Sequence, residues 1–379
     1  MIFLDNASTT MLCESAVENL VKYSTQTYFN PSSNYSVAYA VAKGIEDTKK
    51  LIAEKLGVEF SQNIIFTGSA TEASNLAIMG SYRKHFKKMV FSVGEHPSVY
   101  QTAMNLKELG VEVLFVNLQK NGEVDYAELE KVLDENVSFI SIMHVSNETG
   151  AINDIKRINL LRNKLCPNAI LHCDGVQAFG KIQTNLEELG VDFYTISAHK
   201  LHGPKGLGAL YVKNPRKLKP VMYGGGQEYA LRSGTENVAS IMAFKSALDE
   251  INISKSFEYV GMLNKAFKEK FLSLLKSEIQ PKFVDNENLS PYIISVSVAG
   301  LKGEVLQHMC DSRGLMLSTG SACSSKKSGN RILENLKYNP SEVIGNLRIS
   351  FSRYTSIDDA VQGAEILANC INELWEKTK

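Results

Sequence analysis

A lysine and an aspartate each follow an apolar segment of this chain. Lys200 comes after residues 191–196, in the sequence Ser-Ala-His-Lys, and Asp174 comes after residues 169–173. A lysine amine can form a Schiff base with an aldehyde, and a carboxylate can keep a pyridine nitrogen protonated so that its ring accepts electrons. Together the two residues predict a site for pyridoxal 5'-phosphate (PLP) and therefore chemistry on an amino acid.

A second reactive group lies in residues 317–329, Leu-Ser-Thr-Gly-Ser-Ala-Cys-Ser-Ser-Lys-Lys-Ser-Gly. Cys323 has small polar neighbours, glycines at both ends of the segment and two lysines shortly after it, which favour a thiolate. We therefore predict an exposed, mobile, nucleophilic sulfur. The remaining cysteines lie in apolar or helical contexts typical of small buried side chains: Cys13, Cys166, Cys173, Cys310 and Cys370. With no Cys-x-x-Cys pair, we expect neither structural zinc nor disulfides.

Other polar loops follow predicted strands, where open α/β sheets bind ligands. The loop at residues 67–72 leads into a predicted helix at 73–79, and its small residues, with Ala70 and Thr71, suit a phosphate cradle. Ser69 stands three residues before Glu72, so the motif taken alone favours a helix cap. With Lys200 and Asp174 downstream we favour the phosphate cradle, and both can hold. Ser197 and His199, beside Lys200, could also contact a phosphate.

His96 and Asn147 are weaker candidates. His96 follows the apolar run at 88–93 and could lie over a cofactor ring or transfer a proton near neutral pH, or it could be an ordinary loop residue. Asn147 could donate to a phenolic oxygen of the cofactor, but a turn built on Asn and Gly explains residues 145–150 equally well. Spacing alone does not decide between these interpretations.

The composition is that of an ordinary globular protein. Of the 379 residues, 44% are hydrophobic and 22% are charged, and Lys plus Arg equals Asp plus Glu at 41 each. The balanced charge gives no reason to expect a nucleic-acid or membrane partner, and no apolar run reaches the length of a membrane span. We expect a cytoplasmic protein.

Short apolar runs alternate with helical periods over the first part of the chain, which predicts an α/β fold with a mostly parallel sheet wrapped by helices. The predicted strands are residues 63–67, 88–93, 111–116, 137–143, 169–173, 191–196 and 207–212. Beyond residue 215 the pattern indicates a smaller α+β part, with helices near 237–251, 257–277 and 356–375 and strands at 292–298 and 347–351. We predict a large cofactor domain at 14–252 and a small domain made of 1–13 and 253–379 that carries Cys323.

Motifs spread along nearly the whole chain resemble those of cysteine desulfurases, which are fold-type I PLP enzymes of the class V aminotransferase family. The matching segments are residues 4–10, 29–33, 68–75, 95–96, 147–150, 174–177, 197–200, 224–228, 232–237 and 320–323. The resemblance implies that Lys200 bonds the cofactor, Asp174 holds the pyridinium, His96 stacks on the ring and Gln177 contacts its phenolic oxygen. The phosphate would be held by Ala70, Thr71, Ser197 and His199.

The resemblance also implies a homodimer with composite sites, because Thr235 matches a threonine that reaches the partner subunit's phosphate. Arg348 matches an arginine that pairs with the substrate carboxylate, which suits its forked guanidinium, and Asn147 matches an asparagine near substrate and cofactor. Departures from the family pattern fall at Tyr35 and Ser36, where a histidine is usual, and at Ser352, where glycine is usual.

The activity implied is removal of sulfur from L-cysteine, giving L-alanine and a persulfide on Cys323, with His96 as a candidate base for the substrate thiol. The persulfide would pass to a protein acceptor for iron–sulfur cluster assembly or tRNA thiolation. Alternatives on the same scaffold are a selenocysteine lyase and an aminotransferase for which Cys323 is incidental. An alternative of another class is a non-catalytic scaffold that only binds a sulfur carrier.

Overall fold

The computed structural model describes residues 1–284, 286–319 and 330–378, so Cys323 lies outside the described residues. Its largest sheet has seven strands in the order β2-β8-β7-β6-β5-β3-β4. Their bounds are β2 Ile64–Thr67, β3 Lys88–Ser92, β4 Glu112–Val116, β5 Val137–Ser141, β6 Ile170–Asp174, β7 Phe193–Ser197 and β8 Gly208–Val212. Only β8 runs against its neighbours, β2 and β7, while the other pairings are parallel. The predicted mostly parallel sheet is confirmed, and each predicted strand is found within two residues of its expected ends.

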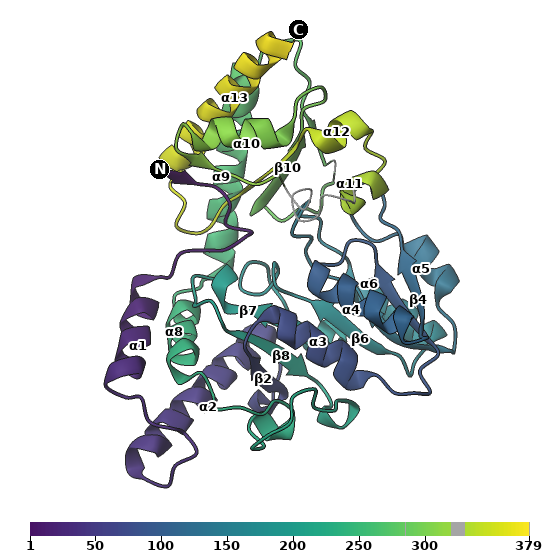
Figure 1. The fold of residues 1–379 in the computed structure, drawn as a ribbon, viewed down its shortest axis with the longest axis vertical. Helices are drawn as coiled ribbons and strands as arrows, with labels where there is room; N and C mark the ends of the chain where they lie inside the picture. Colours follow the sequence, from purple (N-terminus) through teal and green to yellow (C-terminus); the bar gives the residue numbers. More distant parts are fainter. Residues whose placement is uncertain (285, 320–329, 379) are drawn as a thin grey trace.

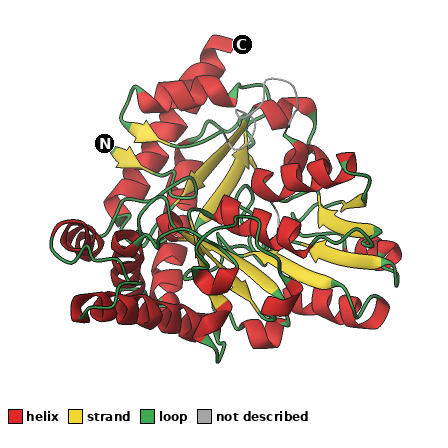
Figure 2. Cartoon of the chain, turned by 60° about the horizontal axis from the view of Figure 1, so that its bottom comes forward, coloured by secondary structure: helices red, strands yellow, loops and turns green. Residues whose placement is uncertain are grey.

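Helices cover both faces of this sheet (Figure 2). They are α1 Glu14–Thr25, α2 Ser36–Leu56, α3 Ala70–Ser81, α4 Pro97–Glu108, α5 Tyr126–Val132, α6 Ile155–Leu165, α7 Leu186–Leu189 and α8 Val238–Asp249. Successive strand residues point to opposite faces, so in β3 the side chain of Val90 joins one apolar cluster while Met89 and Phe91 join another. Burial on both faces explains why these strands are continuous apolar runs in the sequence.

The second part of the molecule contains both chain termini (Figure 1). Its antiparallel sheet has the order β12-β10-β9, and β1 pairs in parallel with β11. The bounds are β1 Ile2–Phe3, β9 Lys282–Phe283, β10 Ile293–Ser297, β11 Leu315–Met316, β12 Asn346–Ser350, α9 Ile253–Leu274, α10 Gly303–Asp311, α11 Arg331–Asn335, α12 Pro340–Ile344 and α13 Ile357–Thr378. One apolar cluster joins Ile2 and Leu4 to Phe267 and Ile371, so the first residues of the chain pack with its last third.

None of the described helices combines the length and hydropathy that a membrane span needs. The cysteines outside the undescribed segment are buried, which confirms the prediction of small buried side chains: Cys13, Cys166, Cys173, Cys310 and Cys370.

Candidate active site

A cavity of about 520 Å³ opens at the edge of the large sheet where the parallel strands end. The predicted site residues that line it are Ala70, Thr71, His96, Asn147, Asp174, Gln177, Ser197, His199, Lys200 and Arg348. Thr235 does not line it and lies exposed on the loop before α8. The nucleophile predicted at Cys323 lies outside the described residues.

Asp174 is the last residue of β6 and is only 5% exposed. Burial raises the pKa of its carboxyl group, although His96, the backbone N–H of Val176 and Lys200 oppose this shift. Its Oδ1 accepts a hydrogen bond from that N–H at 3.0 Å. No Lys or Arg in the described chain forms an ion pair with Asp174, so the carboxylate suits a cationic nitrogen of a ligand.

Lys200 ends the short 3₁₀ turn Ala198–Lys200 that follows β7. Its Nζ donates to the carbonyl oxygens of Ala7 at 2.6 Å and Ser8 at 2.5 Å. Burial, followed by the positive charge of Arg348, lowers the pKa of Lys200 to about 8. A useful fraction of this amine is therefore neutral and nucleophilic near neutral pH.

His96 forms the N-cap of α4, with Pro97 at the first helical position. Its Nδ1 accepts the backbone N–H of Ser98 at 3.2 Å and lies 2.8 Å from the Ser98 hydroxyl. Because a backbone N–H can only donate, the neutral ring carries its proton on Nε2 in this arrangement. Burial lowers the pKa of His96, so the ring is neutral at pH 7.

The N-terminus of α3 borders the cavity with Ala70 and Thr71. Ser69 Oγ accepts the backbone N–H of Glu72 at 3.1 Å, which confirms the predicted cap, and Glu72 Oε2 reaches back to Gly68 N at 2.8 Å. A Cβ placed on Gly208 of β8 would stand 2.5 Å from the Ser69 carbonyl carbon and 2.6 Å from Ala70 N. Glycine thus lets β8 approach this helix end, whose N–H groups and dipole favour an anion.

His199 and Ser197 lie on the same stretch as Lys200. His199 Nδ1 lies 3.1 Å from Thr9 Oγ1, and burial lowers the pKa of His199 to about 4. A neutral His199 can contact an anion only as a hydrogen-bond donor. Ser197 is buried at the end of β7.

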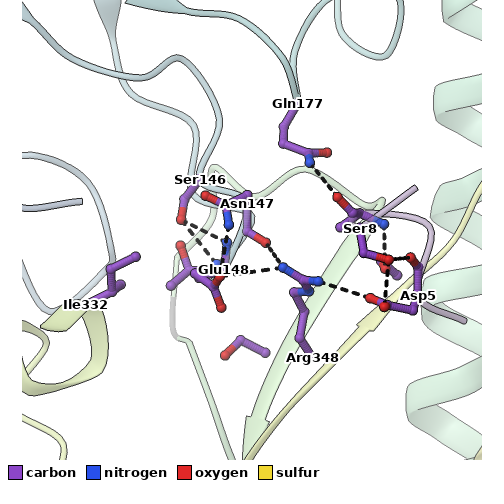
Figure 3. A network of polar contacts seen from close by, with 12 residues as sticks. Asp5, Ser8, Ser146, Asn147, Glu148, Gln177, Ile332 and Arg348 are labelled. Carbon is purple, nitrogen blue, oxygen red and sulfur yellow. Dashed lines mark hydrogen bonds and ion pairs between the residues drawn. The ribbon is translucent and has the colours of Figure 1, made fainter. Parts of the chain in front are cut away.

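Arg348 lies on β12 and reaches the cavity from the second part of the molecule (Figure 3). Its Nη1 donates to the Asn147 carbonyl at 2.9 Å and lies 3.5 Å from Glu148 Oε1, while Nη2 donates to Asp5 Oδ1 at 3.0 Å. Gln177 donates through Nε2 to the Ala7 carbonyl at 3.0 Å. The cavity therefore combines strand ends of the large sheet with residues from β12 and from the start of the chain.

The N-terminal segment is the part of the site that we did not predict from the residues. Asp5 pairs with Arg348, Ala7 and Ser8 accept from Lys200, and Thr9 contacts His199. The available signal was the polar motif at residues 4–10, which we used only as a family match. Among the described residues, no group of three or more His, Cys, Asp or Glu side chains is arranged to hold a metal ion.

Comparison with known proteins gives one family. A family model described as Aminotransferase class-V matches residues 2–362. A protein named cysteine desulfurase IscS 1 from Archaeoglobus fulgidus is 34% identical over 378 residues, which cover 99% of this chain and 98% of the relative. A cysteine desulfurase IscS from Dictyoglomus turgidum is 32% identical over 381 residues, covering 98% of this chain and 95% of the relative.

Solved structures agree with this. One described as a NifS-like protein matches with a TM-score of 0.90 and 28% identity, covering 98% of this chain and 99% of that chain. Another, described as SspA in complex with cysteine, has a TM-score of 0.83 and 26% identity, covering 94% of this chain and 100% of that chain. The chain belongs to the class V aminotransferases, a family that in general depends on PLP.

Proposed function

We propose that this chain is a PLP-dependent cysteine desulfurase that converts L-cysteine to L-alanine and a persulfide on Cys323. One observation carries the proposal: a single cavity is lined by a lysine with a lowered pKa, a buried carboxylate and a buried arginine. Relatives named cysteine desulfurase at 32–34% identity over almost the whole chain, and a similar structure with bound cysteine, support the same substrate.

The residues present fit PLP. When bound, this cofactor supplies an aldehyde that captures amines and a ring that takes up electrons. Asp174 would hold the ring nitrogen, Lys200 would bond the aldehyde carbon, and Gln177 would donate to the phenolic oxygen. The N-terminus of α3, with Ala70 and Thr71, would hold the phosphate together with Ser197 and His199.

The substrate end would be formed by Arg348 and Asn147, with Arg348 taking the carboxylate. His96 would lie over the ring and exchange a proton with the substrate thiol. While Nδ1 accepts from the Ser98 backbone, Nε2 carries the proton, and His96 can only donate a hydrogen bond to the substrate thiol. To act as a base, the ring must instead donate from Nδ1 to the Ser98 hydroxyl, 2.8 Å away, which frees Nε2.

The chain on either side of the undescribed segment supports Cys323 as the nucleophile. Ser318 exchanges backbone hydrogen bonds with Arg348 at 3.1 and 2.7 Å. After the segment, Arg331 donates to the Glu95 carbonyl at 2.6 Å, next to His96. The segment that carries Cys323 thus leaves and re-enters the described chain beside two residues of the cavity.

A homodimer with composite sites is part of the proposal. Large apolar side chains are exposed in the parts of the chain around Thr235 and α2, as an interface requires: Tyr28, Tyr35, Tyr39, Val221, Met222, Tyr223 and Tyr229. Two apolar clusters support a division into a large domain at 14–252 and a small domain at 1–13 and 253–379, although Cys13 packs in the cluster of the large domain. A sulfur carrier for cluster assembly or tRNA thiolation would accept the persulfide.

The test is to add L-cysteine to the purified, PLP-loaded protein and to measure alanine with and without a reductant. We expect alanine and a persulfide on Cys323 that the reductant removes. Cys323→Ser should keep the visible absorbance and form no persulfide, whereas Ser324→Ala, in the same segment, should react normally. Lys200→Ala should lose turnover, while the exposed control Lys213→Ala should keep it.

Each alternative predicts a different result. Activity on selenocysteine but not on cysteine indicates a lyase, and a requirement for a keto acid indicates an aminotransferase. A protein that stays colourless with PLP indicates a scaffold. Normal turnover of Cys323→Ser contradicts the assigned nucleophile.

A further inference from the structure

Lys181 is a buried amine that the proposed reaction does not use. It lies seven residues after Asp174, is 5% exposed, and its Nζ is 5.5 Å from the centre of the Tyr292 ring. Its Nζ donates to Gln177 Oε1 at 2.8 Å. No carboxylate of the described chain lies within 4 Å of this Nζ, so the amine is buried without the partner that usually offsets the cost of burial.

The hydrogen bonds around Gln177 leave its side-chain amide one orientation. On one side lies the Ala7 carbonyl, which can only accept, and Gln177 Nε2 donates to it at 3.0 Å. On the other side lies the Lys181 amine, which donates to Oε1. Flipping the amide would place oxygen against oxygen at Ala7 and, while Lys181 is protonated, hydrogen against hydrogen at Lys181. Within the part of the chain that the structure describes, Lys181 alone donates a hydrogen bond to Oε1.

We propose that Lys181 is a positioning residue that fixes the Gln177 amide so that its NH2 group, and not its oxygen, faces the phenolic oxygen of the cofactor. The proposal rests on the proposed function, because it concerns how that site holds PLP. One Nε2 hydrogen is used by Ala7, and the second is left for the cofactor. Lys200 also donates to the Ala7 carbonyl, so Gln177 and Lys200 share this oxygen atom, and Lys181 is linked to it through Gln177.

The electrostatic surroundings are compatible with this role. Burial first, and then the charges of Lys200 and Arg348, lower the pKa of Lys181 to about 7. Both the neutral and the charged amine donate hydrogen bonds, so the contact to Gln177 survives titration. Among the described residues, the other titratable or charged groups that face Lys181 or Lys200 are Asp5, His96, Asp174, His199, His202, Tyr292 and Arg348.

The test is a double-mutant cycle with Lys181→Met, Gln177→Leu and the double variant, each loaded with PLP. The readout is the pH midpoint at which the visible absorption band of the bound cofactor changes, together with the PLP dissociation constant. Loss of a donor to the phenolic oxygen makes that oxygen more basic, so both single variants should raise the midpoint by at least about 0.5 pH unit, a threefold change in the proton equilibrium. The double variant should shift no further than Gln177→Leu alone.

Lys181→Arg, which keeps a donor, should restore the midpoint to within about 0.2 pH unit, a shift below twofold. The exposed control Lys213→Met should not move it. A wild-type midpoint in Lys181→Met, or shifts that add in the double variant, overturns the proposal, since an additive shift indicates a charge effect on Lys200 and not action through Gln177. Should Lys181→Met not fold, Lys181→Ala carries the same cycle. A wild-type protein without a visible band contradicts the proposed function instead.

Discussion

The buried ion pair between Lys49 of α2 and Glu228 gives a sharp stability prediction. Nζ and Oε2 are 2.7 Å apart, and the two side chains are 5% and 4% exposed. The same Oε2 accepts the Phe66 backbone N–H at 3.0 Å. Glu228 begins a turn of three residues with positive φ angles of 49°, 58° and 61°. This turn leads to the loop that carries Thr235. The pair therefore anchors a strained loop that the proposed dimer needs.

Lys49→Met leaves the Glu228 carboxylate buried without a cation. Removal of one partner of a buried pair typically costs about 3–5 kcal/mol. Burial already raises the pKa of Glu228, against the opposing effect of Lys49, so in the variant this pKa rises further and the group takes up a proton. When the pKa of a group is higher in the folded than in the unfolded protein, the free energy of unfolding falls as the pH rises from the unfolded-state pKa to the folded-state pKa. The fall is about 1.4 kcal/mol per pH unit. The defect should thus be smaller at pH 6 than at pH 7.5.

Denaturant unfolding of the PLP-loaded protein at these two pH values, followed by circular dichroism, measures both effects. Lys50→Met is the matched control. The Lys50 side chain is 63% exposed and its Nζ lies 3.7 Å from Asp47 Oδ1, which makes a weak surface pair, so this substitution should lower the free energy of unfolding by less than about 0.5 kcal/mol. Lys49→Met with Glu228→Gln should recover much of the loss, since glutamine still accepts from Phe66. A defect under about 1 kcal/mol at pH 7.5, or one that does not shrink at pH 6, refutes the reasoning.

Other predictions concern the cavity. The rate at which PLP is incorporated, followed by absorbance, should rise with pH around the Lys200 pKa of about 8, and Arg348→Met should move this midpoint upward because Arg348 lowers that pKa. Gly208→Ala should cost about 1–3 kcal/mol and weaken PLP binding by crowding the start of α3, whereas Gly261→Ala, with nothing within 4 Å of the new Cβ, should be harmless in both assays. Burial raises the pKa of Glu95 to about 8, so its stabilising contribution is complete below its unfolded pKa and falls as the pH rises toward 8. Glu95→Gln, which stays neutral, should therefore gain stability relative to wild type between pH 5 and pH 8 in thermal unfolding.

The sequence predicts the large sheet well because its strands are buried on both faces. Such strands are continuous apolar runs, and these end at the polar residues that line the cavity. The two-residue strands β1, β9 and β11 could not be predicted, because two residues show no periodicity. Their pairing depends on partners far along the chain, such as Leu315 opposite Ile2.

The same distinction applies to the site. Asp174 ends a strand, and His96 and Lys200 follow strands, so local sequence predicts their position. The contact of Ala7 with Lys200 joins residues 193 positions apart, and that of Lys49 with Glu228 joins residues 179 positions apart. No local pattern records such pairs, and a lysine in an amphipathic helix is normally assigned to the solvent face.

Arg348 shows why a correct residue can still have unexpected surroundings. The family match implies that it binds a carboxylate, and in the structure it already contacts two, Asp5 and Glu148. Its Nε is buried and has no partner among the described residues. A carboxylate bound in the forked manner uses Nε with the adjacent Nη, or both Nη atoms. Because Nη1 is held by Asn147 and Glu148, a substrate that uses the unpartnered Nε must share Nη2 with Asp5 or displace it. If Arg348 has its proposed role, the N-terminal segment, which supplies the carbonyl groups around Lys200, also supplies a carboxylate that would compete with the substrate.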